Sequence, residues 1–226
     1  MSFIKKLTIV DILFWVQIVF AFEFCRSQCV GMLRNTEGIN ITWFISWIAF
    51  SSLNFFLTLH LNKGTAKNKM TTYLLWSYGI WGMGAVACAS VMIVTGSGIW
   101  NIRDWLNLGI VAGGILAVSV VARKKGLPIL PYPDPIVKGW FALCFKSLPQ
   151  VVLAINIAII GGGRGLSAGA VWIGHITVCI RLGQLIYTWW DLRCKGATDR
   201  NCNGSLLSEI GNEISWIMVT VAWLLN

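Results

Sequence analysis

Residues 136–160 read IVKGWFALCFKSLPQVVLAINIAII, and only two of these 25 side chains, Lys138 and Lys146, carry a charge. A helix of about 20 apolar residues is long enough to cross the hydrocarbon core of a bilayer. Further apolar runs bounded by charge, Gly or Pro complete a set of predicted helices near 7–24, 41–61, 71–95, 105–122, 136–160, 166–190 and 206–225. We therefore predict an all-α integral membrane protein with seven transmembrane helices.

The composition of the whole chain indicates the same class. Of 226 residues, 56% are hydrophobic and 12% are charged, and the mean hydropathy is +0.70. This balance is too apolar for a water-soluble domain of this length. Backbone groups in lipid must be bonded within their own segment, and the alternating segments of an outer-membrane barrel are absent, so helices are the expected solution.

The basic residues predict an orientation. Of the 18 Lys and Arg residues, twelve lie in the N-terminal segment or in the loops on its side of the membrane, and four lie in the opposite loops. Because cytoplasmic loops are enriched in Lys and Arg, we place the N-terminus in the cytoplasm and expect the cell (inner) membrane. No face interleaves basic with aromatic residues, so the net charge of +9 does not indicate nucleic acid binding.

An internal recurrence divides the chain. Gly38-Ile39-Asn40 opens the second predicted helix, and Gly165-Leu166-Ser167, 127 residues later, opens the sixth. Two three-helix units in the same orientation need one extra crossing between them, and such parallel repeats enclose a cavity between their halves. We therefore expect two parallel three-helix repeats joined by a linker helix, with boundaries at 1–95, 96–130 and 131–226.

A Pro-Gln dipeptide gives this layout a family resemblance. Lys146-Ser147-Leu148-Pro149-Gln150 lies in the fifth predicted helix, and Arg164-Gly165-Leu166-Ser167 and then Trp172 follow at the head of the sixth. This pattern resembles the signature of the PQ-loop and SWEET superfamily of small membrane transporters. The first repeat departs from it, because Val16-Gln17 stands where Pro-Gln is expected and the following loop is longer by about six residues.

The resemblance implies alternating access between the two three-helix bundles, with a solute site near the bilayer midplane and Pro149 as a hinge. It also implies that a Trp and an Asn from each half line the site, which corresponds to Trp47 with Asn54 and to Trp172 with Asn212. The chemistry of the residues allows the alternative that Pro149 is only a packing kink and that these side chains pack between helices.

Other polar and aromatic residues inside the predicted helices are candidates for the same site. Gln150 can hydrogen-bond a polar solute, and the indole of Trp216 can stack on a sugar ring or a flat heterocycle. Arg181 needs a carboxylate, for which Glu213 and Glu23 are the candidates; a paired Arg181 is structural, and an unpaired one favours an anionic solute. His175 with Glu213 forms a proton relay in one interpretation, and is a packing residue in the other.

These observations predict a transporter of a small polar solute, such as a sugar, an amino acid or a vitamin-like molecule, that is either facilitative or proton-coupled. The alternative is a non-transporting receptor or sorting protein on the same fold. We expect no enzyme, cofactor or metal, since no nucleophile triad or metal-ligand cluster is visible. The expected partners are the solute, the lipid bilayer and, in a homo-oligomer, further copies of the chain.

Overall fold

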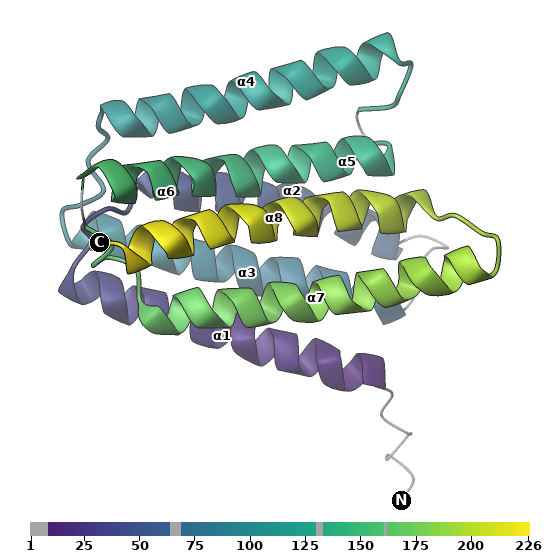
Figure 1. Ribbon diagram of the computed structural model, residues 1–226, viewed down its shortest axis with the longest axis horizontal. Coiled ribbons are helices and arrows are strands. Elements are labelled where there is room, and N and C mark those ends of the chain that lie inside the picture. The colour runs from purple at the N-terminus through teal and green to yellow at the C-terminus, as the bar shows by residue number, and fades with distance from the viewer. Residues whose placement is uncertain (1–8, 64–68, 130–132, 161) are drawn as a thin grey trace, which may run out of the picture.

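A computed structural model describes residues 9–63, 69–129, 133–160 and 162–226 (Figure 1). The regular structure of these residues is entirely helical, as predicted. Its elements are α1 (Ile9–Arg34), α2 (Ile41–Lys63), α3 (Lys69–Val94), α4 (Ile102–Lys124), α5 (Pro135–Ala142), the π-helical turn η1 (Leu143–Ser147), α6 (Leu148–Ile160), α7 (Ala168–Cys194) and α8 (Arg200–Leu224).

Six helical segments of the described chain are long and apolar enough to cross a membrane, counting α5, η1 and α6 as one continuous rod. The prediction of a helical integral membrane protein is supported to this extent. α8 is also long, at 25 residues, but it is not among the six. Its sequence includes Arg200, Glu209 and Glu213, so it has the length of a span without the same apolar composition.

The irregularity in the fifth rod lies next to Pro149. Proline has no N–H to donate, and its ring clashes with the carbonyl four residues earlier, which here belongs to Phe145. The chain accommodates this by widening into η1, where the N–H of Leu148 donates to the carbonyl of Leu143. The predicted distortion at Pro149 is therefore present as a π-helical turn before it.

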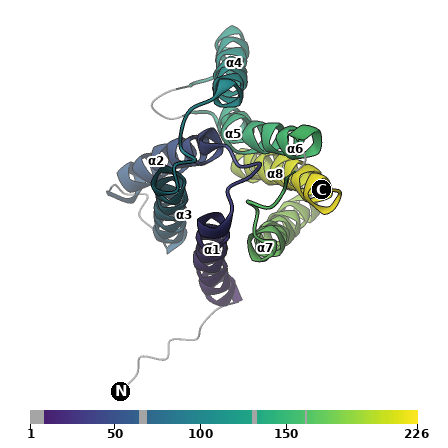
Figure 2. The same cartoon turned by 90° about the vertical axis from the view of Figure 1, so that its left-hand side faces the viewer.

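The helices form two groups of three with the same internal arrangement, seen end-on in Figure 2. In the first group α3 packs between α1 and α2, and in the second α8 packs between the α5–α6 rod and α7. The groups meet along two seams, where α1 packs on α7 and α2 packs on η1 and α6. A twofold relation between the groups would exchange these two seams.

The two helices that open with the recurrent tripeptides begin at Ile41 and Ala168, so the spacing of 127 residues is kept in the structure. One expectation about this region is wrong. The chain between α1 and α2 comprises residues 35–40 and the chain between α6 and α7 comprises residues 161–167, so the first loop is not the longer one. α1 continues as a helix to Arg34, and its polar side chains are bonded outside it, Gln17 to Gln184 of α7 and Gln28 to the carbonyl of Gly165 in the loop before α7.

α4 lies outside both groups, against α5 and the start of α2 (Figure 1). Its N-terminus is held by a capping box between Asn101 and Asp104. The buried Asp104 carboxylate also accepts a hydrogen bond of 2.9 Å from the Thr42 hydroxyl, and Asn107 donates to the same hydroxyl. These bonds join α4 to the first group.

We predict that Gly139→Ala destabilises the contact between α5 and α8. A Cβ at Gly139 would lie 2.5 Å from the carbonyl oxygen of Gly204, so the two helix backbones would have to separate. Overpacking of this kind costs about 1–3 kcal/mol of unfolding free energy, measurable by thermal unfolding in detergent. The control is Gly113→Ala in α4, where an added Cβ has no atom within 4 Å. Equal effects of the two substitutions would contradict this packing.

Candidate functional site

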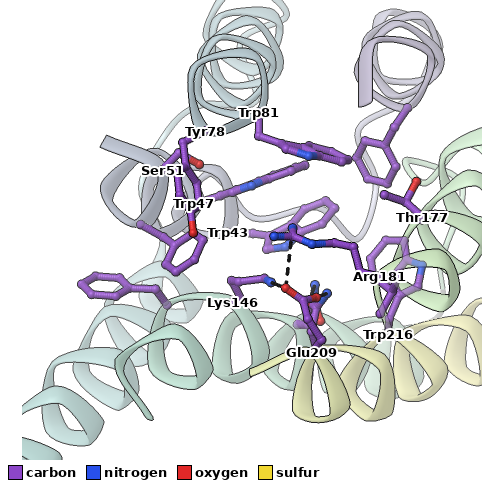
Figure 3. A pocket seen from close by; sticks show the side chains of 17 residues that line it. Trp43, Trp47, Ser51, Tyr78, Trp81, Lys146, Thr177, Arg181, Glu209 and Trp216 are labelled. Carbon is purple, nitrogen blue, oxygen red and sulfur yellow. Dashed lines mark hydrogen bonds and ion pairs between the residues drawn. The ribbon is translucent and has the colours of Figure 1, made fainter. Parts of the chain in front are cut away.

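A cavity of about 90 Å³ lies between the two groups of helices (Figure 3). Every long rod except α4 contributes to its wall. The lining residues are Phe24, Trp43, Trp47, Phe50, Ser51, Tyr78, Trp81, Phe145, Lys146, Gln150, Gly174, Thr177, Val178, Arg181, Glu209, Asn212 and Trp216. A space of this size holds several water molecules, so it can admit a small solute.

One side of the cavity is aromatic. The rings of Trp43, Trp47 and Trp81 come from α2 and α3, and neighbouring centroids are 6.1 Å and 5.1 Å apart. Trp216 of α8 stacks on Trp43 at 6.0 Å, and Phe24 of α1 contacts Trp47 edge-on. The contact between Trp43 and Trp216 crosses from one group to the other, so the wall is aromatic on both sides of the interface. Large flat faces of this kind bind flat or apolar parts of a ligand.

The other side of the cavity is charged. Lys146 Nζ lies 3.1 Å from Glu209 Oε1, and Arg181 Nη1 lies 3.6 Å from the same oxygen. Figure 3 shows Arg181 reaching from α7 toward this carboxylate. The Lys146 and Glu209 side chains are only 14% and 7% exposed, which makes both charges costly unless they stay paired.

A chain of amides continues from the charged residues. Asn212 donates to the second oxygen of Glu209 at 3.4 Å, and Gln150 donates to the side-chain oxygen of Asn212 at 3.1 Å. The Ser215 hydroxyl in turn donates to Gln150. This network fixes the rotamers of Gln150 and Asn212, so their positions in the cavity wall are defined before any ligand enters.

Five of the residues predicted for the site line this cavity. They are Trp47, Gln150, Arg181, Asn212 and Trp216. The structure does not bring Asn54 and Trp172 there. Asn54 is buried and donates to the carbonyl of Phe50 in its own helix, and Trp172 is 54% exposed on the outer face of α7.

Pro149, His175 and Glu213 lie outside the cavity wall. Pro149 is fully buried next to η1. His175 Nδ1 lies 2.6 Å from Glu213 Oε1, and its Nε2 lies 2.7 Å from the Thr220 hydroxyl. The two predicted relay residues are therefore in contact, and the ring centroid of His175 lies 6.3 Å from that of Trp216.

The expected partner of Arg181 needs correction. Neither Glu213 nor Glu23 pairs with it, because Glu213 contacts His175 and Glu23 pairs with Arg26 on an exposed face of α1. Its partner is Glu209, which the sequence analysis did not select. The predicted helix began at 206 and placed Glu209 at the membrane surface, whereas α8 begins at Arg200. A usable signal was the spacing of Glu209, Asn212 and Glu213, which puts three polar residues on one helix face.

Polar contacts join the two groups at the end of the bundle where α1 and α6 end. Gln28 donates to the carbonyl of Gly165 at 2.8 Å and accepts from the N–H of Ser167 at 3.3 Å. The hydroxyls of Ser27 and Ser167 are 2.7 Å apart. On the other seam Asn156 donates to Asn40 at 3.0 Å. Each recurrent tripeptide is therefore held by the first helix of the opposite group, and we call these contacts the polar latch.

Comparisons of the chain with family models, with curated proteins and with solved structures find no match. The function must therefore be argued from the cavity and from the arrangement of the helices.

We predict that Glu209→Gln strongly destabilises the fold, because it leaves Lys146 and Arg181 as like charges with no carboxylate between them. Breaking a buried pair in this way costs about 3–5 kcal/mol. Thermal unfolding in detergent measures the effect. Glu23→Gln is the matched control, since its partner Arg26 is solvent-exposed and the melting temperature should hardly change. A Glu209 variant as stable as the Glu23 variant would show that the pairing contributes little.

Proposed function

We propose that this protein is a membrane transporter that moves a small polar solute by alternating access between its two three-helix groups. The observation that carries the proposal is a cavity lined by both groups and placed at their interface. A solute held there would contact both groups at once. Rocking one group against the other would then expose it to one side of the membrane at a time.

The repeated arrangement supports this mechanism. In each group the third helix packs between the first and second, and the two seams between the groups are equivalent. We infer that the groups are parallel repeats and that α4 is the linker helix, in keeping with the resemblance to the PQ-loop and SWEET superfamily. Because both seams are built from corresponding helices, one group can tilt against the other along both seams at once.

The proposal requires α8 to be the seventh span. α8 packs along both neighbours in its group, and its buried face includes Glu209, Asn212 and Ser215. These polar groups point into the bundle and are bonded there, so they need not contact lipid. A helix of 25 residues spans roughly 37 Å, which exceeds the hydrocarbon thickness.

We infer the orientation from the basic residues at the two ends of the bundle. The end of the bundle that contains the α4–α5 and α7–α8 connections includes Arg123, Lys124, Lys125, Lys195 and Arg200 (Figure 1). The end with the polar latch includes Arg34, Arg103 and Arg164. We propose that the first end is cytoplasmic and that the latch closes the outer end. The N-terminal Lys5 and Lys6 lie outside the described residues.

Either a facilitative or a proton-coupled form can use this cavity. The coupled form would use His175 and Glu213, whose second carboxylate oxygen is buried without a hydrogen-bond partner among the described residues. In that form, an imposed inward proton gradient drives solute accumulation in proteoliposomes, and Glu213→Gln abolishes the accumulation but keeps exchange at equal pH. Accumulation that persists in the variant excludes this pair as the coupling site.

The first test is solute flux into proteoliposomes. A panel of sugars, amino acids and vitamin-like molecules is screened by thermal shift on the purified protein, and the solutes that bind are assayed for counterflow. We expect a solute that binds also to exchange across the membrane. Binding without flux would instead support a receptor on the same fold.

A second prediction concerns the latch. With Cys at positions 27 and 167, where the serine hydroxyls are 2.7 Å apart, oxidation should form a disulfide between the two groups. The protein for this test has its seven native cysteines replaced, and must itself transport. We expect oxidation to abolish flux, to leave binding intact, and to be reversed by reductant.

Each single-cysteine variant is a control, because it cannot form the cross-link. Flux that continues at the unlocked rate after complete cross-linking would contradict alternating access through this end of the bundle.

A further inference from the structure

We propose that the cavity binds a small organic anion whose carboxylate lies at Lys146 and Arg181 and whose flat, apolar part lies against the tryptophans. The inference rests on the proposed function for its role as the transported solute, but the binding site itself does not depend on transport. The proposed site narrows the predicted solute classes, which are sugars, amino acids and vitamin-like molecules, to molecules with a net negative charge.

The first step is the charge of the cavity wall. Of its lining residues, Lys146 and Arg181 are cationic and Glu209 is anionic. Both cations are directed to the same carboxylate oxygen, at 3.1 Å and 3.6 Å. One carboxylate balances one of them, so the wall keeps one positive charge in excess.

No other acidic residue can supply the missing charge. All nine Asp and Glu residues lie within the described chain, and none besides Glu209 lines the cavity. The others lie elsewhere, with partners in parentheses where an interaction has been described: Asp11 (Tyr73), Glu23 (Arg26), Glu37 in an exposed loop, Asp104 (Thr42), Asp134 (Arg200), Asp191 (Lys195), Asp199 at the start of α8 and Glu213 (His175).

The second step is the cost of this imbalance. An uncompensated charge among membrane helices is expensive, and such residues face a cavity or pair with another group. The Arg181 side chain is 26% exposed, more than either of its two charged neighbours, and it extends into the cavity (Figure 3). Its guanidinium has five N–H donors in a planar fork, and it contacts Glu209 at 3.6 Å and the hydroxyl of Tyr78, which leaves donors over. A carboxylate fits the remaining donors.

The third step is the opposite wall. Trp43, Trp47 and Trp81 present ring surface within the same cavity, and the Trp216 N–H is already donated to the carbonyl of Val171 at 3.1 Å. That indole therefore offers its apolar face and no free donor. The polar groups on this side are the hydroxyls of Ser51 and Tyr78 beside a much larger ring surface, so a flat apolar group gains more contact area than a hydroxyl-rich solute gains hydrogen bonds. The charged side and the aromatic side of the cavity together favour a ligand in which a carboxylate is joined to a ring.

The experiment measures binding of four probes to the purified full-length protein in detergent by titration calorimetry. Benzoate, benzamide and benzylamine share a ring and differ in charge, and acetate has the carboxylate without the ring. We expect benzoate to bind about tenfold more tightly than benzamide, and acetate to bind more weakly than benzoate. Equal affinity for benzoate and benzamide, a preference for benzylamine, or no binding of benzoate overturns the proposal.

Arg181→Gln tests the origin of the preference, because it leaves a neutral Lys146–Glu209 pair that does not strain the fold. We expect benzoate affinity to fall about tenfold and benzamide affinity to stay nearly constant, while Arg181→Lys retains most of the preference. Arg26→Gln removes a cation outside the cavity and should change neither affinity. An unchanged benzoate affinity in Arg181→Gln overturns the assignment.

These experiments distinguish a failure of the anion-site proposal from a failure of the transporter proposal. If benzoate binds selectively and no solute that binds is transported, the anion site stands and the transporter proposal fails. If neutral solutes are transported and benzoate has no advantage over benzamide, the transporter proposal stands and the anion site fails.

Discussion

The second group of helices is organised around the ion pairs of Glu209. This carboxylate, on α8, pairs with Lys146 from η1 and with Arg181 from α7, and the Glu209 side chain is only 7% exposed. Three polar side chains that lipid would reject are thereby collected at one point. Because an ion pair inside the membrane loses far more energy when broken than a surface pair, η1, α7 and α8 must keep their relative positions. The amides of Asn212 and Gln150 extend the same constraint to α6.

The two groups contribute different side chains to the cavity wall. Three of the four tryptophans in the wall come from α2 and α3, and the three charged residues in the wall come from η1, α7 and α8. Two groups with the same helix arrangement therefore build a wall whose two sides differ chemically. The proposed ligand is oriented by this difference, with its polar end at the second group.

The distortion in the fifth rod connects the sequence motif to this wall. Pro149 prevents a regular helix at its own position, and the chain widens into a π-helical turn that includes Phe145 and Lys146. Both residues line the cavity, and Lys146 lies 5.4 Å from the ring centroid of Phe50 across the seam. Pro149, the predicted hinge, therefore also determines the backbone position from which Lys146 extends into the cavity.

Local properties of the chain predicted the membrane class, the approximate helix positions and two helix starts at 41 and 166, of which the first is confirmed and the second lies two residues before Ala168. Hydropathy and a repeated tripeptide act over a few residues, so they can be read without the fold. They also placed Trp47, Gln150, Arg181 and Trp216 inside predicted helices, and the family resemblance implied a place for Asn212 in the site. The rotation of each helix about its own axis cannot be read from local sequence, because packing against distant helices determines it.

That rotation turned Trp172 outward and left Asn54 bonded to its own helix. Start points also depend on distant contacts, and an α8 that begins at Arg200 places Glu209 well inside the bundle rather than at its surface. The sequence alone determined that one intramembrane cation, Arg181, needed a carboxylate. Only the tertiary structure decided that Arg181 shares Glu209 with Lys146, because the two cations lie 28 and 63 positions from Glu209 in the sequence and meet it only after the helices have packed.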